Sequence, residues 1–124
     1  MRILIVDDSK FIRQYLRQHL ERLGMACEEA GNGVDAIERL RADSAFDLML
    51  CDVNMPLMNG LECVRQVRLQ ELASQMKIVM VTTEADSSFI SQSLDFGADE
   101  FLMKPFTPQS LREKLLLIGF DLAA

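Results

Sequence analysis

The chain has 124 residues, of which 49% are hydrophobic and 26% charged, and its formal net charge is −6 at pH 7. This length and composition are those of one globular domain that buries its own core, and they exclude a disordered protein. The acidic balance argues against direct binding to nucleic acid or to an anionic membrane surface, because both need a basic surface.

Apolar runs typical of strands alternate along the chain with apolar stripes at helical spacing. The first run, RILIV at residues 2–6, lacks strict alternation, which predicts a strand covered on both faces. A helical stripe that includes Phe11 follows it, with Ser9 placed to cap its start and Gly24 placed to end it. The chain therefore opens with a strand and a helix, and this pair is repeated.

Turn-forming residues divide the rest of the chain. Residues 52–60 contain Met-Pro and Asn-Gly pairs, which predict an irregular loop of functional type. Gly97 is placed to end the fourth helix, and Thr107 and Pro108 supply a cap and a first-turn proline for the last one. We expect strands at residues 2–6, 25–30, 48–51, 77–81 and 100–103, and helices at about 10–23, 34–40, 61–72, 86–96 and 108–118.

Strict alternation of strand and helix predicts a parallel sheet with helices on both faces, because crossover connections between parallel strands are right-handed. The expected fold class is therefore α/β, a three-layer sandwich with a five-stranded parallel sheet and five helices. The chain contains no linker, internal repeat or low-complexity tract, so residues 1–124 are expected to form one domain.

The sequence offers no membrane segment and no disulfide framework. No apolar run approaches the roughly 20 residues that span a bilayer, and the start lacks the apolar segment of a signal peptide. Three cysteines, Cys27, Cys51 and Cys63, are an odd number without metal-ligand spacing. We expect a cytoplasmic protein without membrane insertion, whose reduced cysteines are small buried hydrophobes.

Polar side chains follow four of the five predicted strands. In an open α/β sheet, ligands bind outside the carboxyl ends of the strands, so these side chains are expected to converge. Carboxylates brought together repel one another unless a cation intervenes, and a hard divalent ion with oxygen ligands, Mg²⁺, suits them best. The residues are Asp7 and Asp8 after the first strand, Asp52 after the third, Thr82 after the fourth and Lys104 after the fifth.

These residue types point to phosphoryl chemistry. Asp8 and Asp52 are candidates for direct magnesium ligands, Asp7 for a ligand through water, and the backbone carbonyl of Asn54 completes the set. One carboxylate can also act as a nucleophile that forms an aspartyl phosphate. Positioning and charge neutralisation are the main needs of phosphoryl transfer, and Lys104 and the Thr82 hydroxyl can supply them. A cis peptide between Lys104 and Pro105 would fix the approach of the lysine, but the sequence leaves the isomer open.

With these motifs in order, the chain resembles the receiver domain of two-component response regulators, most closely the single-domain chemotaxis-type regulators. The resemblance covers essentially the whole chain, and it implies a flavodoxin-like fold with strand order 2-1-3-4-5. It is carried by four blocks, Val6-Asp7-Asp8-Ser9, residues 51–60 (CDVNMPLMNG), Val81-Thr82-Thr83-Glu84-Ala85 and Lys104-Pro105-Phe106.

The resemblance implies a role for each site residue. Asp52 would accept a phosphoryl group from a histidine of a partner kinase, and Asp7 and Asp8 would hold magnesium. Lys104 would contact the phosphoryl group, and Thr82 would be the switch hydroxyl. Phe101 occupies the position of a coupled aromatic residue that is tyrosine in many family members, but it lacks the tyrosine hydroxyl.

The same resemblance implies the partners and the activity. A histidine kinase or phosphotransfer protein would supply the phosphoryl group, and a downstream output protein would bind the switched surface of a monomer or a weak phosphorylation-dependent dimer. Self-phosphorylation from a phosphodonor and weak self-dephosphorylation would be its only enzyme-like activities. Thr83 is larger than the alanine common beside the switch threonine, so we expect slower loss of phosphate.

Two other functions compete with this interpretation. A metal-dependent phosphohydrolase of the haloacid-dehalogenase type would use the same charges, but Asp7-Asp8-Ser9 lacks its alternating aspartates and the chain has no room for a cap. A flavodoxin-like flavin binder would need a Ser/Thr/Gly-rich phosphate loop after the first strand. The kinase, the pathway and the completeness of the chain stay open, as does whether the apolar residues Leu116, Leu117, Phe120 and Leu122 bury locally or meet a partner.

Overall fold

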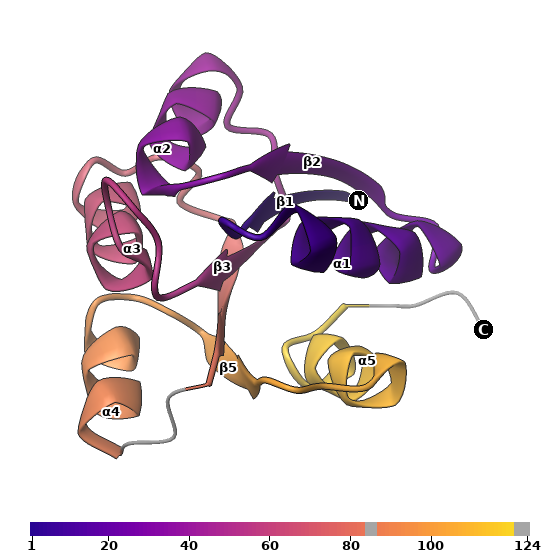
Figure 1. The fold of residues 1–124 in the computed structure, drawn as a ribbon. Helices are drawn as coiled ribbons and strands as arrows, with labels where there is room; N and C mark the ends of the chain where they lie inside the picture. Colours follow the sequence, from indigo (N-terminus) through magenta and orange to yellow (C-terminus); the bar gives the residue numbers. More distant parts are fainter. Residues whose placement is uncertain (84–86, 121–124) are drawn as a thin grey trace.

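The computed structural model describes residues 1–83 and 87–120, along which strands and helices alternate as predicted (Figure 1). The predicted start of the fourth helix at Asp86, the family residues Glu84 and Ala85, and Leu122 lie outside the described residues. The strands are β1 (Arg2–Val6), β2 (Ala26–Ala30), β3 (Leu48–Asp52), β4 (Lys77–Thr82) and β5 (Glu100–Met103). The helices are α1 (Lys10–Arg22), α2 (Gly33–Ala42), α3 (Gly60–Leu69), α4 (Ser87–Asp95) and α5 (Pro108–Leu117).

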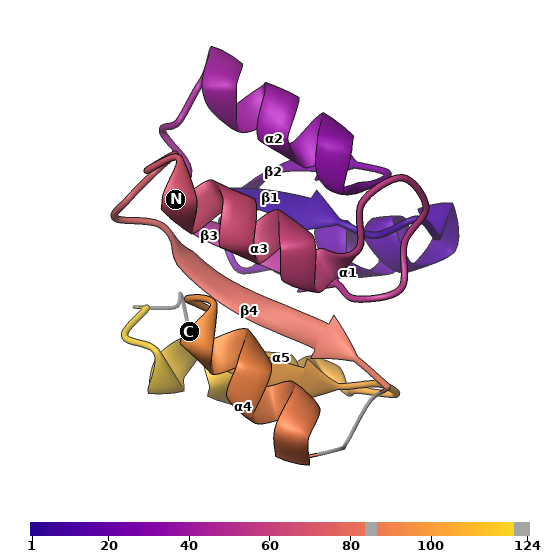
Figure 2. The same ribbon diagram turned by 90° about the vertical axis from the view of Figure 1, so that its left-hand side faces the viewer.

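The strands form one parallel sheet in the order β2-β1-β3-β4-β5, which confirms the expected order. Helices α1 and α5 cover one face, and α2, α3 and α4 cover the other (Figures 1 and 2). The three-layer α/β sandwich predicted from the alternation is therefore confirmed. Within this sheet, β1 and β3 are direct neighbours, with Val6 opposite Cys51.

Two apolar cores lie between the sheet and its helices, one on each face. Alternate residues of a strand point to opposite faces, so Ile3 and Ile5 pack with α1 and α5, whereas Leu4 and Val6 pack with α2 and α3. Every residue of β3 is buried, as expected for the central strand. All three cysteines are free and buried, which confirms that they serve as apolar core residues.

The helix ends confirm most of the predicted signals. Ser9 caps α1, because its hydroxyl oxygen accepts the Ile12 N–H at 3.3 Å, and Gly24 follows the helix with φ +85°. Thr107 forms a capping box with Ser110, with Pro108 at the first helical position. Two asparagines that looked only like loop formers are also caps, Asn32 for α2 and Asn59 for α3.

Three details of the prediction are wrong. Phe11 belongs to the predicted apolar stripe, yet its exposed fraction is 74%, because it lies in the first turn of α1, beyond the carboxyl edge of the sheet. Helix α3 ends at Leu69 rather than at Leu72, and the residues after it adopt left-handed backbone at Glu71 and Ala73. Strand β3 reaches one residue further than expected, so that Asp52 ends it.

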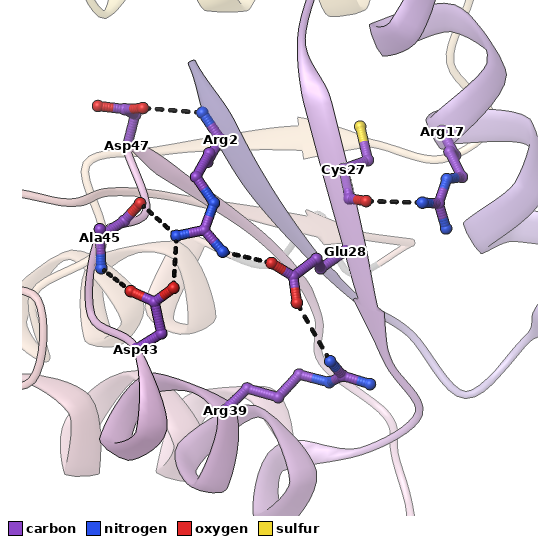
Figure 3. A network of polar contacts seen from close by, with 8 residues as sticks. All are labelled: Arg2, Arg17, Cys27, Glu28, Arg39, Asp43, Ala45 and Asp47. Atoms are coloured by element: carbon purple, nitrogen blue, oxygen red, sulfur yellow. Dashed lines mark hydrogen bonds and ion pairs between the residues drawn. The ribbon is translucent and has the colours of Figure 1, made fainter.

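Charged contacts tie the opposite, amino end of the sheet together (Figure 3). The Arg2 guanidinium donates to Asp43 at 2.8 Å and to the Ala45 carbonyl at 3.0 Å, and it pairs with Glu28 of β2. Arg39 of α2 contacts the other oxygen of Glu28 at 3.3 Å. These contacts hold the edge strand β2 and the end of α2 against β1, far from the carboxyl edge. Along the described residues, no helix combines the length and apolar character needed to cross a membrane.

Candidate functional site

The carboxyl edge of the sheet brings three aspartates together. One carboxylate oxygen each from Asp7, Asp8 and Asp52 lies within 4.8 Å of the other two. They meet because β1 and β3 are hydrogen-bonded neighbours, so that residues following the two strands emerge side by side. The convergence predicted for these three residues is therefore present.

Asp7 makes four hydrogen bonds and is only 2% exposed. Its N–H donates to the Ala30 carbonyl at 3.1 Å, which extends the pairing of β1 with β2. Its Oδ1 accepts the N–H of Ser9 at 2.8 Å, and its Oδ2 accepts from Lys104 Nζ at 3.1 Å. Its own carbonyl oxygen accepts from Arg13 Nη1 at 2.6 Å. Asp8, the next residue, is exposed and turns toward solvent.

Asp52 ends β3 and is 8% exposed. Its Oδ1 accepts the N–H of Val53 at 2.8 Å and lies 3.3 Å from Lys104 Nζ. Helix α3 begins against this strand end, where the Gly60 N–H donates to the Val53 carbonyl at 2.8 Å. A Cβ on Gly60 would lie 2.9 Å from the Asp52 carbonyl carbon, so only glycine allows this approach.

Lys104 follows the edge strand β5, and its side chain bridges the two buried carboxylates. Its ammonium group pairs with Asp7 at 3.1 Å and with Asp52 at 3.3 Å. Its own N–H donates to the Thr82 carbonyl at 2.7 Å, which extends the pairing of β4 with β5. The peptide bond between Lys104 and Pro105 is cis. The backbone and the side chain of Lys104 thus connect the ends of β1, β3, β4 and β5.

Burial and neighbouring charges shift the pKa values of Asp52 and Lys104. Burial raises the pKa of Asp52, and repulsion from Asp7 adds to the rise, while Lys104 opposes it only in part. Burial alone would lower the pKa of Lys104, but its bonds to Asp7 and Asp52 outweigh this effect, and the pKa is raised. The cluster thus holds three carboxylates, of which Lys104 pairs with two, and the excess negative charge favours a cation.

The donor set fits a hard divalent cation. Carboxylate oxygens from three residues gather at one point, and no soft sulfur or imidazole ligand belongs to the cluster. The cluster mixes two buried aspartates with one exposed aspartate, so it is reachable from solvent. Magnesium, which prefers one or two carboxylates together with water, is the ion that this chemistry favours.

The other predicted residues lie around the cluster. Thr82 is buried at the end of β4, next to Val81, which pairs with Asp52. Asn54 is exposed in the loop after β3. Phe101 lies outside the cluster, half-buried within β5 against the core on the α2 and α3 face, and Lys114 Nζ lies 4.8 Å from its ring centre.

Arg13 is the residue of this site that the sequence reasoning missed. Its guanidinium reaches the Asp7 carbonyl from the first turns of α1 and also pairs with Glu29 at 3.0 Å. A basic residue one turn after the Ser9 cap was the available signal, because a side chain there points back toward the start of its helix.

The comparisons with known proteins agree on one protein family. The family model of the response regulator receiver domain matches residues 3–116. Chemotaxis protein CheY1 of Helicobacter pylori is 40% identical over 119 residues, which are 95% of this chain and 96% of the relative. A CheY homologue of Campylobacter jejuni is 41% identical over 116 residues, covering 93% of this chain and 89% of the relative.

A solved structure agrees with these sequence relatives. Chemotaxis protein CheY4 of Vibrio cholerae superposes with a TM-score of 0.88 at 36% identity, over 94% of this chain and 97% of that chain. The matched region includes every residue of the acidic cluster and Lys104. The chain belongs to the response regulator receiver domain family.

Proposed function

We propose that this protein is a phosphorylation-activated signalling receiver that accepts a phosphoryl group on Asp52 and then binds a partner protein. The observation that carries this proposal is the position of the Asp52 carboxylate, which lies beside Asp7 and Asp8 and within 3.3 Å of the Lys104 ammonium group. A carboxylate that ends a central strand next to an acidic cluster and one lysine suits transfer of phosphate from a donor to the protein.

Asp52 is the nucleophile of this reaction. A carboxylate oxygen forms the new bond to phosphorus, and the bond from phosphorus to the donor's histidine nitrogen breaks, with its electron pair returning to the imidazole. The Val53 N–H and Lys104 both hold Oδ1, so the carboxylate has a fixed orientation before the donor arrives. Lys104 also offsets the negative charge of the incoming group.

Asp8, Asp52 and the Asn54 carbonyl would hold magnesium directly. Asp7 would act through water, because both of its oxygens already accept bonds from Ser9 and Lys104. The bound ion supplies positive charge that neutralises the carboxylates and the phosphoryl oxygens. The cluster itself keeps an exposed side at Asp8, where the donor can approach.

The response to phosphorylation is a shift between two conformations. New charge at Asp52 favours the conformation in which the Thr82 hydroxyl bonds the phosphoryl group. The Lys104 N–H donates to the Thr82 carbonyl at 2.7 Å. A movement of Thr82 therefore displaces the end of β5, the strand that contains Phe101. Phe101 has no hydroxyl, so its contribution to the output surface is the packing of its ring.

The proposed partners follow from this chemistry. A histidine kinase or phosphotransfer protein of the cytoplasm supplies the phosphoryl group, and an output protein recognises the switched surface. The relatives from Helicobacter pylori and Campylobacter jejuni carry chemotaxis names, which makes a chemotaxis output the first to test. Self-phosphorylation and weak self-dephosphorylation are the catalytic activities that we assign to the chain alone.

The test is intact-protein mass after incubation with magnesium and acetyl phosphate. We expect one phosphoryl group on the wild-type protein, removed by hydroxylamine and absent from the Asp52→Asn variant. Asp47→Asn is the matched control, because Asp47 precedes the same strand that Asp52 ends, and asparagine can still accept the Arg2 N–H that Asp47 binds at 2.8 Å. Continuous hydrolysis of small phosphate esters without an adduct on Asp52 would contradict the proposal and favour a phosphohydrolase.

A further inference from the structure

Arg13 is a second positively charged residue, besides Lys104, that contacts the acidic cluster, and it does so through the backbone. Arg13 Nη1 donates to the carbonyl oxygen of Asp7 at 2.6 Å, and the Arg13 side chain is only 18% exposed. The contact is made to the main chain and leaves the Asp7 carboxylate to Ser9 and Lys104. Arg13 therefore acts on the path of the chain at the end of β1.

Glu29 of the edge strand β2 fixes the direction of Arg13. One Glu29 oxygen pairs with Arg13 Nε at 3.0 Å, and the other pairs with Arg17 Nη1 at 2.6 Å. Although burial raises the pKa of Glu29, its bonds to Arg17 and Arg13 outweigh this, and the pKa lies below its ordinary value. Glu29 is thus an ionised anchor shared by two arginines one turn apart on α1.

The peptide unit between Asp7 and Asp8 transmits this contact to the acidic cluster. The carbonyl group of Asp7 and the N–H and Cα of Asp8 lie in one rigid plane. Holding the carbonyl therefore fixes the plane from which the Asp8 side chain projects. Asp8 is the exposed aspartate of the cluster, with the least protein around it to hold its orientation.

We propose that Arg13, held by Glu29, is a positioning residue for the magnesium site and acts by fixing the peptide between Asp7 and Asp8. This inference rests on the proposed function, because it assumes that the cluster binds magnesium. Hydrogen-bonded groups behind metal ligands commonly set affinity, and their loss weakens binding by about tenfold or more.

Electrostatics and positioning predict opposite results when Arg13 is neutralised. Removing a cation near an acidic site lessens the repulsion of Mg²⁺ and would tighten its binding. Losing the bond to the Asp7 carbonyl frees the peptide and would weaken binding. The sign of the change in magnesium affinity therefore separates the two effects.

Arg17 provides a matched control for charge and for the contact with Glu29. It pairs with the same glutamate but turns its other nitrogens to Glu21 at 2.7 Å and to the Cys27 carbonyl at 2.7 Å. Figure 3 shows the contact with the Cys27 carbonyl. Arg17→Gln removes the same charge and the same type of ion pair as Arg13→Gln. It leaves the peptide between Asp7 and Asp8 untouched.

The experiment is isothermal titration calorimetry of Mg²⁺ into the full chain, with circular dichroism to confirm folding. We expect Arg13→Gln to raise the magnesium Kd about tenfold and Arg17→Gln to leave it at the wild-type value. Arg13→Lys should lie between wild type and Arg13→Gln, because one ammonium group cannot hold the Asp7 carbonyl and Glu29 as a planar guanidinium does. Glu29→Gln should also weaken binding, and its effect should not add to that of Arg13→Gln, because both act through one contact.

The outcomes separate this inference from the function on which it rests. If the wild-type protein fails to bind Mg²⁺, the proposed magnesium site fails. If the wild-type protein binds Mg²⁺ and Arg13→Gln binds it equally well or more tightly, the positioning role of Arg13 is refuted. Should Arg13→Gln not fold, Arg13→Lys and Glu29→Gln decide in the same way, since wild-type affinity in both would overturn the inference.

Discussion

Gly60 is the position at which one added methyl group should disturb the phosphoacceptor most directly. It is the first residue of α3, and its N–H holds the Val53 carbonyl at 2.8 Å. In Gly60→Ala, the new Cβ would overlap the carbonyl oxygen of Asp52 and lie 2.9 Å from both its carbonyl carbon and the Val53 Cα. These are backbone atoms, so no flexible side chain can turn away to make room.

The expected size of the effect follows from that distance. Carbon atoms in contact normally lie about 3.5–4.0 Å apart, so the two carbon contacts alone require the end of β3 and the start of α3 to separate by about 0.6–1.1 Å. The overlap with the Asp52 carbonyl oxygen requires at least as much. Such overpacking costs about 1–3 kcal/mol of the free energy of unfolding. The better helix propensity of alanine returns less than about 1 kcal/mol at this first position. A displacement of Asp52 by about 1 Å can slow phosphoryl transfer by about 100-fold.

Gly24→Ala is the control with a similar loss of stability and no contact with the site. Gly24 has φ +85°, and a Cβ there would meet no atom within 4 Å. The left-handed backbone alone costs alanine about 1–2 kcal/mol. Urea unfolding gives the stability of both variants, and intact mass over time gives their rates of phosphorylation by acetyl phosphate in magnesium.

We expect both variants to lose stability and only Gly60→Ala to lose phosphorylation. Equal phosphorylation rates in the two variants would refute the reasoning, because they would show that the end of β3 tolerates the displacement or that α3 moves alone. A Gly60→Ala variant as stable as the wild-type protein would refute the steric estimate itself.

Three further predictions concern residues at and near the site. Without magnesium, Asp52→Asn should raise the free energy of unfolding at pH 7, because burial and repulsion from Asp7 raise the pKa of Asp52 above 3.8. The stabilising contribution of Asp52 is complete below pH 3.8 and is lost as the pH rises through its folded-state pKa. The stability that Asp52→Asn gains over the wild-type protein should therefore grow over this pH range in urea titrations. A gain in stability that shrinks with rising pH would contradict the direction of the pKa shift. Leu57→Asn should stabilise the protein by about 0.5–1 kcal/mol, because Leu57 has φ 68° and is 82% exposed, and asparagine adopts left-handed backbone more readily than leucine. If urea unfolding shows no gain in the free energy of unfolding, the left-handed backbone costs leucine nothing there. Thr83→Ala should lose phosphate faster, because Thr83 is exposed beside Thr82 and would narrow the access of water; an unchanged or slower decay of the phosphorylated mass would refute this.

Local patterns were sufficient to predict the elements of the fold. The apolar run at residues 2–6, which lacks strict alternation, predicted a strand covered on both faces, and β1 is buried from Ile3 to Val6. Ser9, Gly24 and the Thr107-Pro108 pair marked helix ends correctly, because capping depends on hydrogen bonds and backbone angles within a few residues. The strand order, by contrast, came from the family resemblance, since periodicity does not say which strands are neighbours.

Sequence reasoning also found the aspartates and the lysine at the strand ends. It could do so because the carboxyl ends of parallel strands share one edge, whatever the side chains between them. It did not find Arg13, whose role depends on contacts with the Asp7 carbonyl and with Glu29 of β2. It placed Phe11 in the core, because a helical stripe does not reveal where the sheet beneath the helix ends.

The sequence by itself thus determined the alternation of strands and helices, the caps and the set of polar residues at one edge, because each depends on neighbours along the chain. Only the tertiary structure decided which of those residues touch. Lys104 and Asp7 are 97 residues apart in the chain, yet their side chains lie 3.1 Å apart. A contact of that kind is set by the order and register of the strands, which arise only when the whole sheet packs between its helices.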